Sequence, residues 1–477
     1  MSIGELLKRC ADAAPEATAV ISAGRAYDFG VLAEASRRIA AQLTPGTRVL
    51  ARIDNTPASV VAIHAAWMAG CSVVSASPMV PDAEVARRAE TTGTSSVLTP
   101  RGSQGLEVSI GAAEGATPAP AGEALVMFTS GTTGAPKGAS LTFGALQASV
   151  AGIAAGSGLG KEGRLPRVPA RDPQLILVPL AHMGGFLGTL SAWWLGKPML
   201  LTEKFSAGLI FDLVQQYRLG VLKLTPAMVW DLVQADSDGP LPGISSATVG
   251  TAALPEATRI AFERKYGVPI LRNYGQTEFA GAIAFERPDD VAAGIRPDNT
   301  VGRVAPGVEV MIVDADGNRL TAGEVGEITA RATSAMSGYL DGEGRPSAPG
   351  TWLHTGDLGV IDDDGFLAVV GRLRDTIICG GFNVYPAQLE AALNRIVAVA
   401  DSAVVGIPDE RLGEIPVAAV VLNRGEQVTS DGIRAELRTS LAPYELPREV
   451  VAVAEIPRLP TGKVDRAGVS GLFQEQS

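Results

Sequence analysis

The chain has 477 residues, 46% hydrophobic and 19% charged, a balance typical of folded proteins with more than one domain and not of disordered ones. Its net charge of −11 argues against a general nucleic-acid or membrane-surface binder, but is compatible with a local basic site for a phosphate ligand. Cys10, Cys71 and Cys379 are widely spaced and form no disulfide framework or zinc motif, which predicts a reducing, cytoplasmic environment.

The N-terminal third contains no segment that predicts a membrane span. Residues 1–9 carry charge and lack an apolar signal core. The most apolar region, residues 59–77, is interrupted by His64 and Gly70, and this pattern predicts a buried helix followed by a strand. We therefore expect His64 to be a core histidine.

Helical and strand patterns alternate over most of the chain, which predicts an α/β fold with mainly parallel sheets covered by helices. Helices are expected at residues 31–43, 209–217, 227–234 and 256–266, and strands at 49–53, 125–128, 175–178 and 221–224. Residues 101–122 are rich in Gly, Ala and Pro and are expected to form an exposed connection.

From about residue 308 the pattern changes to hairpins. Residues 308–313 precede a turn at 314–317, and a second acidic turn at 362–365 lies between two short strands. These features predict a small antiparallel or barrel-like subdomain over about residues 300–371. A new α+β pattern begins after the charged run 372–375, with helices expected at 386–395 and 431–441 and a strand at 417–422. We therefore expect an N-terminal domain of residues 1–373 and a smaller, mobile domain of residues 374–477.

Residues 129–138 follow a predicted buried strand and contain glycines, hydroxyl side chains and Lys137. Glycines allow backbone N–H groups to approach an anion, hydroxyls add donors and the lysine supplies positive charge. This composition predicts a phosphate-binding loop. It is not a Walker A loop, because Pro136 precedes Lys137 and Gly138 follows it. Taken alone, a Gly/Thr-rich segment of this kind is more often an ordinary flexible surface loop, so the rest of the chain must decide.

Five further motifs follow in order along the chain. They are Asn273-Tyr274-Gly275-Gln276-Thr277-Glu278, Trp352-Leu353-His354-Thr355-Gly356-Asp357, Gly371-Arg372, Gly380-Gly381-Phe382-Asn383-Val384-Tyr385-Pro386 and Pro460-Thr461-Gly462-Lys463. Each motif alone is weak evidence. Together with the loop, over essentially the whole chain, they resemble the adenylate-forming superfamily of acyl-CoA synthetases, firefly luciferase and the adenylation domains of peptide synthetases.

The resemblance implies a two-step reaction. A carboxylate attacks the α-phosphate of ATP to give an acyl-adenylate and pyrophosphate, and a thiol, usually that of coenzyme A, then displaces AMP. The implied contacts to the β- and γ-phosphates are Thr129, Ser130, Gly131, Thr132, Thr133, Gly134 and Lys137. Tyr274 would pack on the adenine, and the backbone of Gly250, Thr251 and Ala252 would line its other side. The remaining implied nucleotide-binding residues are Asn273, Gly275, Asp357 for the ribose and Arg372 near the ribose and phosphate. Thr277 would contact the α-phosphate and Glu278 would hold Mg²⁺, which prefers carboxylate oxygen.

The resemblance also implies a moving second domain. Lys463 would bridge the acid carboxylate and the α-phosphate, yet it lies in a different domain from Glu278. Rotation about a hinge at Arg374 would then bring Gly380 and Gly381 to the site, where they would line the tunnel for the thiol.

The acid is expected to lack an α-amine. Amino-acid-activating relatives carry an aspartate near the start of the helix after Pro179, but residues 181–186 contain no acidic side chain, and an unpaired buried ammonium is costly. His182 is the candidate group beside the substrate carboxylate, with a packing role as the alternative. The expected pocket residues are His182, Met183, Gly184, Gly185, Phe186, Thr225, Ala252, Ala253, Ala280 and Gly281.

Two alternatives to a coenzyme A ligase are open. The first is a stand-alone enzyme that loads the phosphopantetheine of a carrier protein, because both thiols share the same end group. The second is a non-catalytic nucleotide-binding relative, which the full set of motif residues disfavours. Departures from the family pattern are mild. Thr251 stands where relatives often have glycine, and Arg374 stands at the hinge, where Asp or Lys is common.

Overall fold

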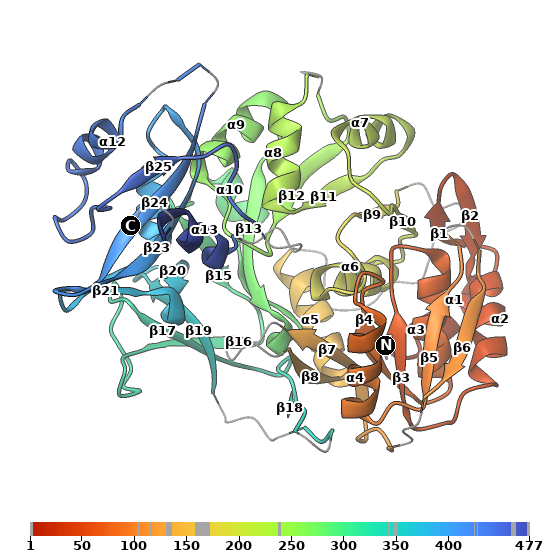
Figure 1. The fold of residues 1–477 in the computed structure, drawn as a ribbon. Coiled ribbons are helices and arrows are strands. Elements are labelled where there is room, and N and C mark those ends of the chain that lie inside the picture. Colours follow the sequence, from red (N-terminus) through yellow and green to blue (C-terminus); the bar gives the residue numbers. More distant parts are fainter. Residues whose placement is uncertain are drawn as a thin grey trace.

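The described part of the chain forms four β-sheets with helices packed against them (Figure 1). This computed structural model describes residues 3–102, 105–113, 117–129, 136–157, 172–236, 240–341, 344–346, 352–423, 425–426, 428–458 and 464–474. The predicted fold class is confirmed, with parallel sheets and helices in the large N-terminal part and a smaller α+β unit at the C-terminal end, coloured blue.

The helices described in the structure include most of those expected from the hydrophobic pattern. Their bounds are α1 Leu6–Ala13, α2 Phe29–Ala40, α3 Pro57–Met68, α4 Asp82–Thr92, α5 Phe143–Gly156, α6 Met183–Trp194, α7 Ala207–Gln216, α8 Pro226–Gln234, α9 Glu256–Tyr266, α10 Pro288–Ala292, α11 Pro386–Leu393, α12 Ser430–Leu437 and α13 Arg466–Gln474, with short 3₁₀ helices η1 Thr277–Phe279 and η2 Leu373–Asp375. Among the helices in the described ranges, none is long and apolar enough to cross a bilayer.

Helix α3 is buried all round, as its apolar sequence predicted. Thr56 caps it by accepting a hydrogen bond from the Ser59 amide, and a proline stands in its first turn. His64 packs between Trp67 and Trp193, with ring centroids 5.2 and 5.0 Å away. Burial lowers the pKa of His64 to about 3, so the ring is neutral at physiological pH. The prediction of a core histidine is confirmed.

A seven-stranded sheet lies near the N-terminal end, in the order β18-β8-β7-β4-β3-β5-β6. Its strands are β3 Arg48–Arg52, β4 Ser72–Ala76, β5 Ser96–Pro100, β6 Val108–Ala112, β7 Glu123–Thr129, β8 Lys137–Thr142 and β18 Gly338–Tyr339. Strand β6 corrects the expectation that residues 101–122 are only a connection: it pairs antiparallel with β5 at the sheet edge. Its first three residues are only half-buried, so the strand is short and its apolar signal is weak beside the flanking Gly, Ala and Pro.

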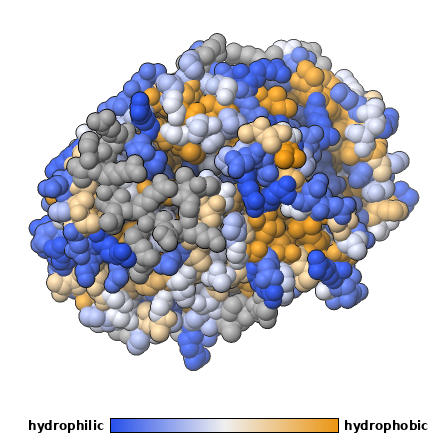
Figure 2. Space-filling model, turned by 180° about the vertical axis from the view of Figure 1, so that it is seen from behind, coloured by the Kyte–Doolittle hydropathy of each residue, from blue (hydrophilic) through white to orange (hydrophobic). Residues whose placement is uncertain are grey.

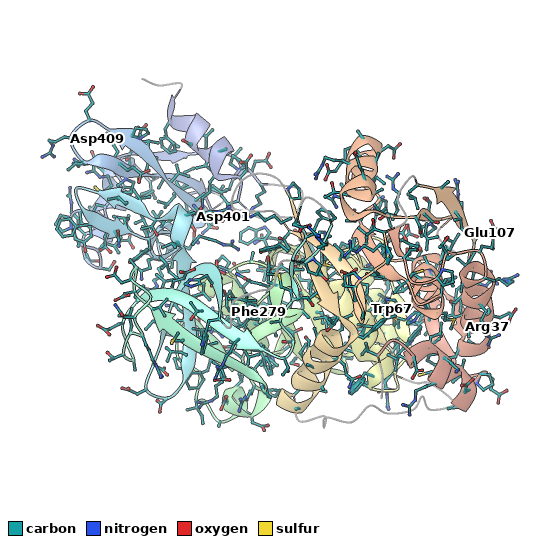
Figure 3. All side chains as sticks on the ribbon, turned by 90° about the horizontal axis from the view of Figure 1, so that it is seen from below. Arg37, Trp67, Glu107, Phe279, Asp401 and Asp409 are labelled. Atoms are coloured by element: carbon teal, nitrogen blue, oxygen red, sulfur yellow. The ribbon has the colours of Figure 1, made fainter. Side chains whose placement is uncertain are left out.

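A four-stranded sheet packs nearby, in the order β2-β1-β10-β9. Its strands are β1 Thr18–Ser22, β2 Arg25–Asp28, β9 Gln174–Ile176 and β10 Met199–Leu201. The largest hydrophobic core joins these first two sheets through helices α3 and α6. Figure 3 shows Trp67 in this part of the molecule, where its indole N–H donates to the carbonyl of Ala124 at 2.9 Å.

The nine-stranded sheet joins the parallel part of the fold to the antiparallel part, in the order β11-β12-β13-β14-β15-β20-β19-β17-β16. Its strands are β11 Gly220–Leu224, β12 Ile244–Val249, β13 Ile270–Gln276, β14 Gly281–Phe285, β15 Thr300–Val304, β16 Val308–Val313, β17 Gly326–Ala332, β19 Leu353–Ile361 and β20 Phe366–Arg372. Strand β13 is the junction, because it pairs parallel with β12 and antiparallel with β14. The motif that begins at Asn273 lies at this junction, and Phe279 just beyond it is fully buried near the centre of the molecule (Figure 3).

The C-terminal sheet contains β21 Ile377–Cys379, β22 Phe382–Val384, β23 Val399–Asp409, β24 Gly413–Leu422 and β25 Val450–Ala452. It has hydrophobic cores of its own, with α11 and α12 on one face and α13 on the other. The chain passes to it from the nine-stranded sheet through η2. On the face opposite to that of Figure 1, hydrophilic residues predominate and hydrophobic residues gather in patches between them (Figure 2).

Candidate active site

Three strands of the nine-stranded sheet bring polar side chains together around Asp357. The antiparallel register of β19 and β20 places Asp357 directly opposite Arg372, and the Arg372 Nε lies 2.7 Å from Asp357 Oδ1. From β13, the Tyr274 hydroxyl and the Gln276 Nε2 each donate to Asp357 Oδ2 at 2.7 Å. Three of the sequence motifs therefore meet at one carboxylate, which is only 4% exposed.

The electrostatics of this cluster fix its protonation and orientation. Burial and the adjacent Asp357 carboxylate raise the pKa of the Tyr274 phenol well above its usual range, so the hydroxyl stays protonated and donates. Gln276 also donates to the Thr355 carbonyl at 2.9 Å, which ties the end of β13 to β19. The carboxylate is thus held in one orientation by three donors, and its remaining lone pairs are left for a ligand.

A second cluster surrounds Glu278 in η1, directly after β13. The Tyr339 hydroxyl donates to Glu278 Oε1 at 2.6 Å, and burial together with this carboxylate raises the pKa of the Tyr339 phenol above its usual range. The Lys137 ammonium lies 5.5 Å from the centre of the Tyr339 ring. Lys137 pairs in register with Thr129, so both described ends of the loop 129–138 lie at this cluster.

Some of the predicted site residues lie outside the described part of the chain. These are Ser130, Gly131, Thr132, Thr133 and Gly134 of the loop, and Lys463 with its Pro-Thr-Gly context. Their proposed roles stay predictions.

The predicted adenine-side segment lies at the carboxyl end of β12. Asn273 Nδ2 donates to the Val249 carbonyl at 3.0 Å, which holds β13 beside the start of the segment Gly250-Thr251-Ala252. Thr251 has a φ of +73°, a left-handed conformation that is unfavourable for a β-branched residue. Threonine at this position, where relatives often have glycine, is therefore expected to lower the stability of the fold.

The predicted acid-pocket residues divide by exposure. His182 is the exposed N-cap residue of α6, and Thr225 caps α8 by accepting from the Met228 amide at 3.3 Å. The exposed or half-exposed members are His182, Gly184, Thr225, Ala252, Ala253 and Gly281, and the buried members are Met183, Gly185, Phe186 and Ala280.

The buried members have packing functions. A Cβ at Gly185 would lie 2.2 Å from the Pro179 carbonyl oxygen, so only glycine allows α6 to start this close to the preceding segment. Phe186 packs on Trp67, with ring centroids 5.9 Å apart. The Ala280 carbonyl accepts a hydrogen bond from the Ser149 hydroxyl at 2.6 Å.

The predicted hinge and tunnel residues lie at the start of the C-terminal sheet. Gly380 and Gly381 have φ values of +58° and +86° and form the tight turn between Cys379 and Phe382, which are paired in register. Positive φ at both turn residues is typical of a type I′ hairpin, which favours glycine at both positions. The geometry of the turn therefore explains this glycine pair without reference to a thiol tunnel. Arg374 lies in η2 with a half-exposed side chain.

Two contributors to the site had no role assigned from sequence. Gln276 lies inside a recognised motif but offered no sign of its partner, because Asp357 is 81 residues away. Tyr339 lies in a strand of two residues, too short for a periodic pattern, and reaches Glu278 across 61 residues of chain. The one local sequence signal near Tyr339 is Gly338, a residue type that often marks an irregular backbone.

Comparison with known proteins identifies the family. Residues 7–340 match the family model "AMP-binding enzyme", and residues 388–463 match "AMP-binding enzyme C-terminal domain". The chain is 35% identical to the indoleacetate–CoA ligase of Aromatoleum aromaticum over 363 residues, covering 74% of this chain and 69% of that protein. It is 30% identical to the 2-succinylbenzoate–CoA ligase of Bacillus velezensis, with 96% of each chain covered.

A solved structure supports the same conclusion over nearly the full length. The o-succinylbenzoate CoA synthetase of Bacillus subtilis, in complex with its acyl-adenylate intermediate, superimposes with a TM-score of 0.82 at 26% identity, covering 98% of this chain and 97% of that one. The chain therefore belongs to the AMP-binding enzyme family, in the acid–CoA ligase branch of the adenylate-forming superfamily.

Proposed function

We propose that this AMP-forming acid–CoA ligase activates a carboxylic acid without an α-amine at the site between the Asp357 and Glu278 clusters. The observation that carries the proposal is the convergence of Tyr274, Gln276 and Arg372 on Asp357. This oriented carboxylate can accept hydrogen bonds from ribose hydroxyls, while Arg372 offers positive charge to the adjacent phosphate. Both features suit a nucleotide whose α-phosphate is attacked.

The proposed chemistry needs charge neutralisation and alignment. Carboxylate and triphosphate are both anionic, so the site must bring them together against repulsion and hold an in-line geometry. Lys137 and the loop 129–138 would hold the β- and γ-phosphates as the leaving group, and Thr277 would contact the α-phosphate. The position of Lys137 beside the Tyr339–Glu278 pair supports this assignment.

Glu278 fits a Mg²⁺ ion that is bound together with ATP. Among the residues that the structure describes, no group of three His, Cys, Asp or Glu side chains could hold a metal on its own. Mg²⁺ characteristically binds through one or two carboxylates plus substrate phosphates and water, so a single carboxylate beside the phosphate loop is a suitable protein contribution. The ion would offset the negative charge of the phosphates, and Tyr339 orients the carboxylate that holds it.

The second domain is proposed to supply a different group to each step. Lys463 would act in adenylation, whereas Gly380 and Gly381 would line the thiol tunnel after rotation about Arg374. The chain leaves one sheet at Arg372 and enters the next at Ile377, which supports a domain boundary between residues 373 and 374.

Coenzyme A is the proposed thiol acceptor. The relatives described above are acid–CoA ligases, and they give no support to the carrier-protein alternative. A cytoplasmic location is proposed because Cys10, Cys71 and Cys379 are all free and buried.

The acid is proposed to be an organic acid bound beside His182, the exposed residue at the start of α6. The absence of an acidic side chain over residues 181–186 supports an acid without an ammonium group. Because related enzymes are named for indoleacetate and 2-succinylbenzoate, these two acids are the first candidates to test.

ATP–pyrophosphate exchange tests the proposal directly. Aliphatic, aryl and polycyclic acids are compared with amino acids, and the active acids are then assayed for thioester formation with coenzyme A and with a carrier protein. We expect exchange with acids that lack an amine and thioester formation with coenzyme A. Exchange with amino acids alone would overturn the assignment of the acid, and transfer only to a carrier protein would overturn that of the acceptor.

Lys463→Ala tests the division of roles between the two steps. This variant should nearly abolish adenylate formation but still form thioester from supplied acyl-adenylate. Equal loss of both steps would contradict the proposed division, and loss of neither would remove Lys463 from the mechanism.

A further inference from the structure

Lys223 lies on the strand that leads into the candidate acid pocket and has no partner among the residues that the structure describes. It lies on β11, and no described side chain or carbonyl pairs with its ammonium. Leu222 and Leu224 point into the core beneath α8 and α9, so Lys223 points to the opposite face of the sheet. The side chain is partly buried, and loss of hydration lowers the pKa of its ammonium to about 8.

Strand register places Lys223 on the same sheet face as a residue of the nucleotide cluster. Lys223 is opposite Thr248 on β12, and Thr248 is opposite Leu271 on β13. Asn273 follows Leu271 by two residues, so its side chain emerges on the same face. This is the face on which Asn273 holds the end of β12.

Of the segments proposed to surround the acid, one follows the strand that contains Lys223 and another follows a strand that contacts it. Thr225, which caps α8, follows it by two residues. Strand β9 contacts β11 and leads through residues 177–181 to His182 at the start of α6. Lys223 therefore lies on β11 before the point at which the strand leads into Thr225, and β11 contacts the strand that leads to His182.

We infer that Lys223 binds a second carboxylate of the substrate, at the end of the acid remote from the reacting carboxyl group. This inference rests on the proposed function of the site. A hydrocarbon tail would surround the ammonium without pairing it, and a partly buried cation without a hydrogen-bonding partner is unfavourable. A carboxylate supplies both charge and acceptors. The substrate class is therefore dicarboxylic acids, of which one carboxyl group is activated.

Matched pairs of acids test this inference in the full-length enzyme. Hexanoate is compared with adipate, and 3-phenylpropanoate with 3-(4-carboxyphenyl)propanoate, by ATP–pyrophosphate exchange. The variants are Lys223→Met, which keeps a long flexible side chain without charge, and Lys223→Arg, which keeps the charge. Lys204→Met, at an exposed lysine between β10 and α7, is the matched control.

Wild-type enzyme should prefer the dicarboxylate of at least one pair. Lys223→Met should raise the KM for that acid about tenfold or more while leaving its monocarboxylate partner unchanged or improved, because only the charged pair is lost. Lys223→Arg should retain part of the preference and Lys204→Met all of it. Retained turnover of the monocarboxylate shows that the variant is folded.

The outcomes separate the inference from the proposed function. If acids support exchange but no dicarboxylate is preferred, or if Lys223→Met affects both members of a pair equally, the role of Lys223 is wrong and the ligase function stands. If no acid of either kind supports exchange, the proposed function fails, and the role of Lys223 fails with it.

Discussion

Tyr339 donates a hydrogen bond from its hydroxyl to Glu278 Oε1 at 2.6 Å, and so joins a two-residue strand to the 3₁₀ turn that follows β13. The same segment also holds the backbone of Glu278, because the Met336 amide donates to the Glu278 carbonyl at 2.7 Å. Strand β18 pairs with β8, whose first residue is Lys137. The orientation of Glu278 is thereby coupled to the end of the loop 129–138.

Replacing Tyr339 with phenylalanine should weaken adenylation without unfolding the protein. The ring would stay beside Lys137, but Glu278 would lose the donor that orients it, and loss of a hydrogen bond to a charged group typically costs about 1.5–3 kcal/mol. We expect ATP–pyrophosphate exchange to fall about tenfold or more and the Mg²⁺ concentration for half-maximal rate to rise. Tyr444→Phe, at a half-exposed tyrosine stacked on Phe382, is the control. Unchanged exchange and Mg²⁺ dependence in Tyr339→Phe would show that the contact is not needed.

Arg374 lies between two ion pairs that anchor the chain on either side of it. Arg372 pairs with Asp357 of the nine-stranded sheet at 2.7 Å, and Asp375 pairs with Arg466 of α13 at 3.0 Å. Any rotation between the domains that keeps both pairs intact must therefore occur in the backbone around residues 373 and 374.

Arg374→Pro should consequently impair the thioester step more than adenylation. Proline fixes φ at its own position and restricts the preceding residue, so it would hold the segment near one conformation. Arg374→Ala is the matched control, because it removes the side chain but leaves the backbone free. The two half-reactions are measured separately, by pyrophosphate exchange and by release of thioester from supplied acyl-adenylate. Parallel losses in both, or an equal effect of alanine, would argue against a backbone hinge here.

Local patterns were sufficient to predict most of the helices and parallel strands. Helix α9 was expected at residues 256–266 and is observed as Glu256–Tyr266, because it is bounded by Pro255 and by Gly267 in a left-handed conformation. The acidic turn at 362–365 likewise joins β19 and β20 as expected. Strand β6 was missed because it is a short edge strand with few buried side chains.

The site was only partly predictable, because its geometry depends on contacts between distant residues. Family motifs named Asp357, Arg372 and Tyr274, but strand register decides that all three meet at one carboxylate. Tyr339 and Lys223 belong to none of these motifs, and their positions follow only from the sheet order. Local sequence therefore named residues that meet in the structure, but not the contacts across the sheets that bring them together.

Thr251→Gly should be neutral or stabilising, although most substitutions destabilise. Thr251 has a φ of +73°, and left-handed backbone costs about 1–2 kcal/mol for a residue with a Cβ, which exceeds the loss of about 0.5–1 kcal/mol from the greater backbone entropy of glycine. The control is Ala252→Gly, at the next residue, whose φ is not positive, and this variant should be destabilised by about 0.5–1 kcal/mol. The stability of both variants relative to wild type is measured by thermal unfolding. Equal destabilisation of the two would mean that no strain is stored at Thr251.

His64 should make the free energy of unfolding fall as the pH is lowered from about 6.5 toward 3. Its pKa is about 3 in the folded protein, whereas an unperturbed histidine, as in the unfolded chain, has a pKa of 6.5. Well above pH 6.5 the ring is neutral in both states, so it makes almost no pH-dependent contribution. Between the two values only the unfolded chain binds the proton, which favours unfolding by up to about 1.4 kcal/mol per pH unit.

The variant His64→Phe isolates this effect, because it keeps an aromatic ring between Trp67 and Trp193 but removes the titrating group. Carboxylates also titrate over this range, so the informative quantity is the difference between the two proteins. Their unfolding free energies, measured by denaturant titration at pH 5, 7 and 8, should change in parallel from pH 8 to 7. From pH 7 to 5 the wild type should lose up to about 2 kcal/mol more than the variant. Parallel behaviour down to pH 5 would mean that His64 takes up its proton as readily in the folded core as in the unfolded chain.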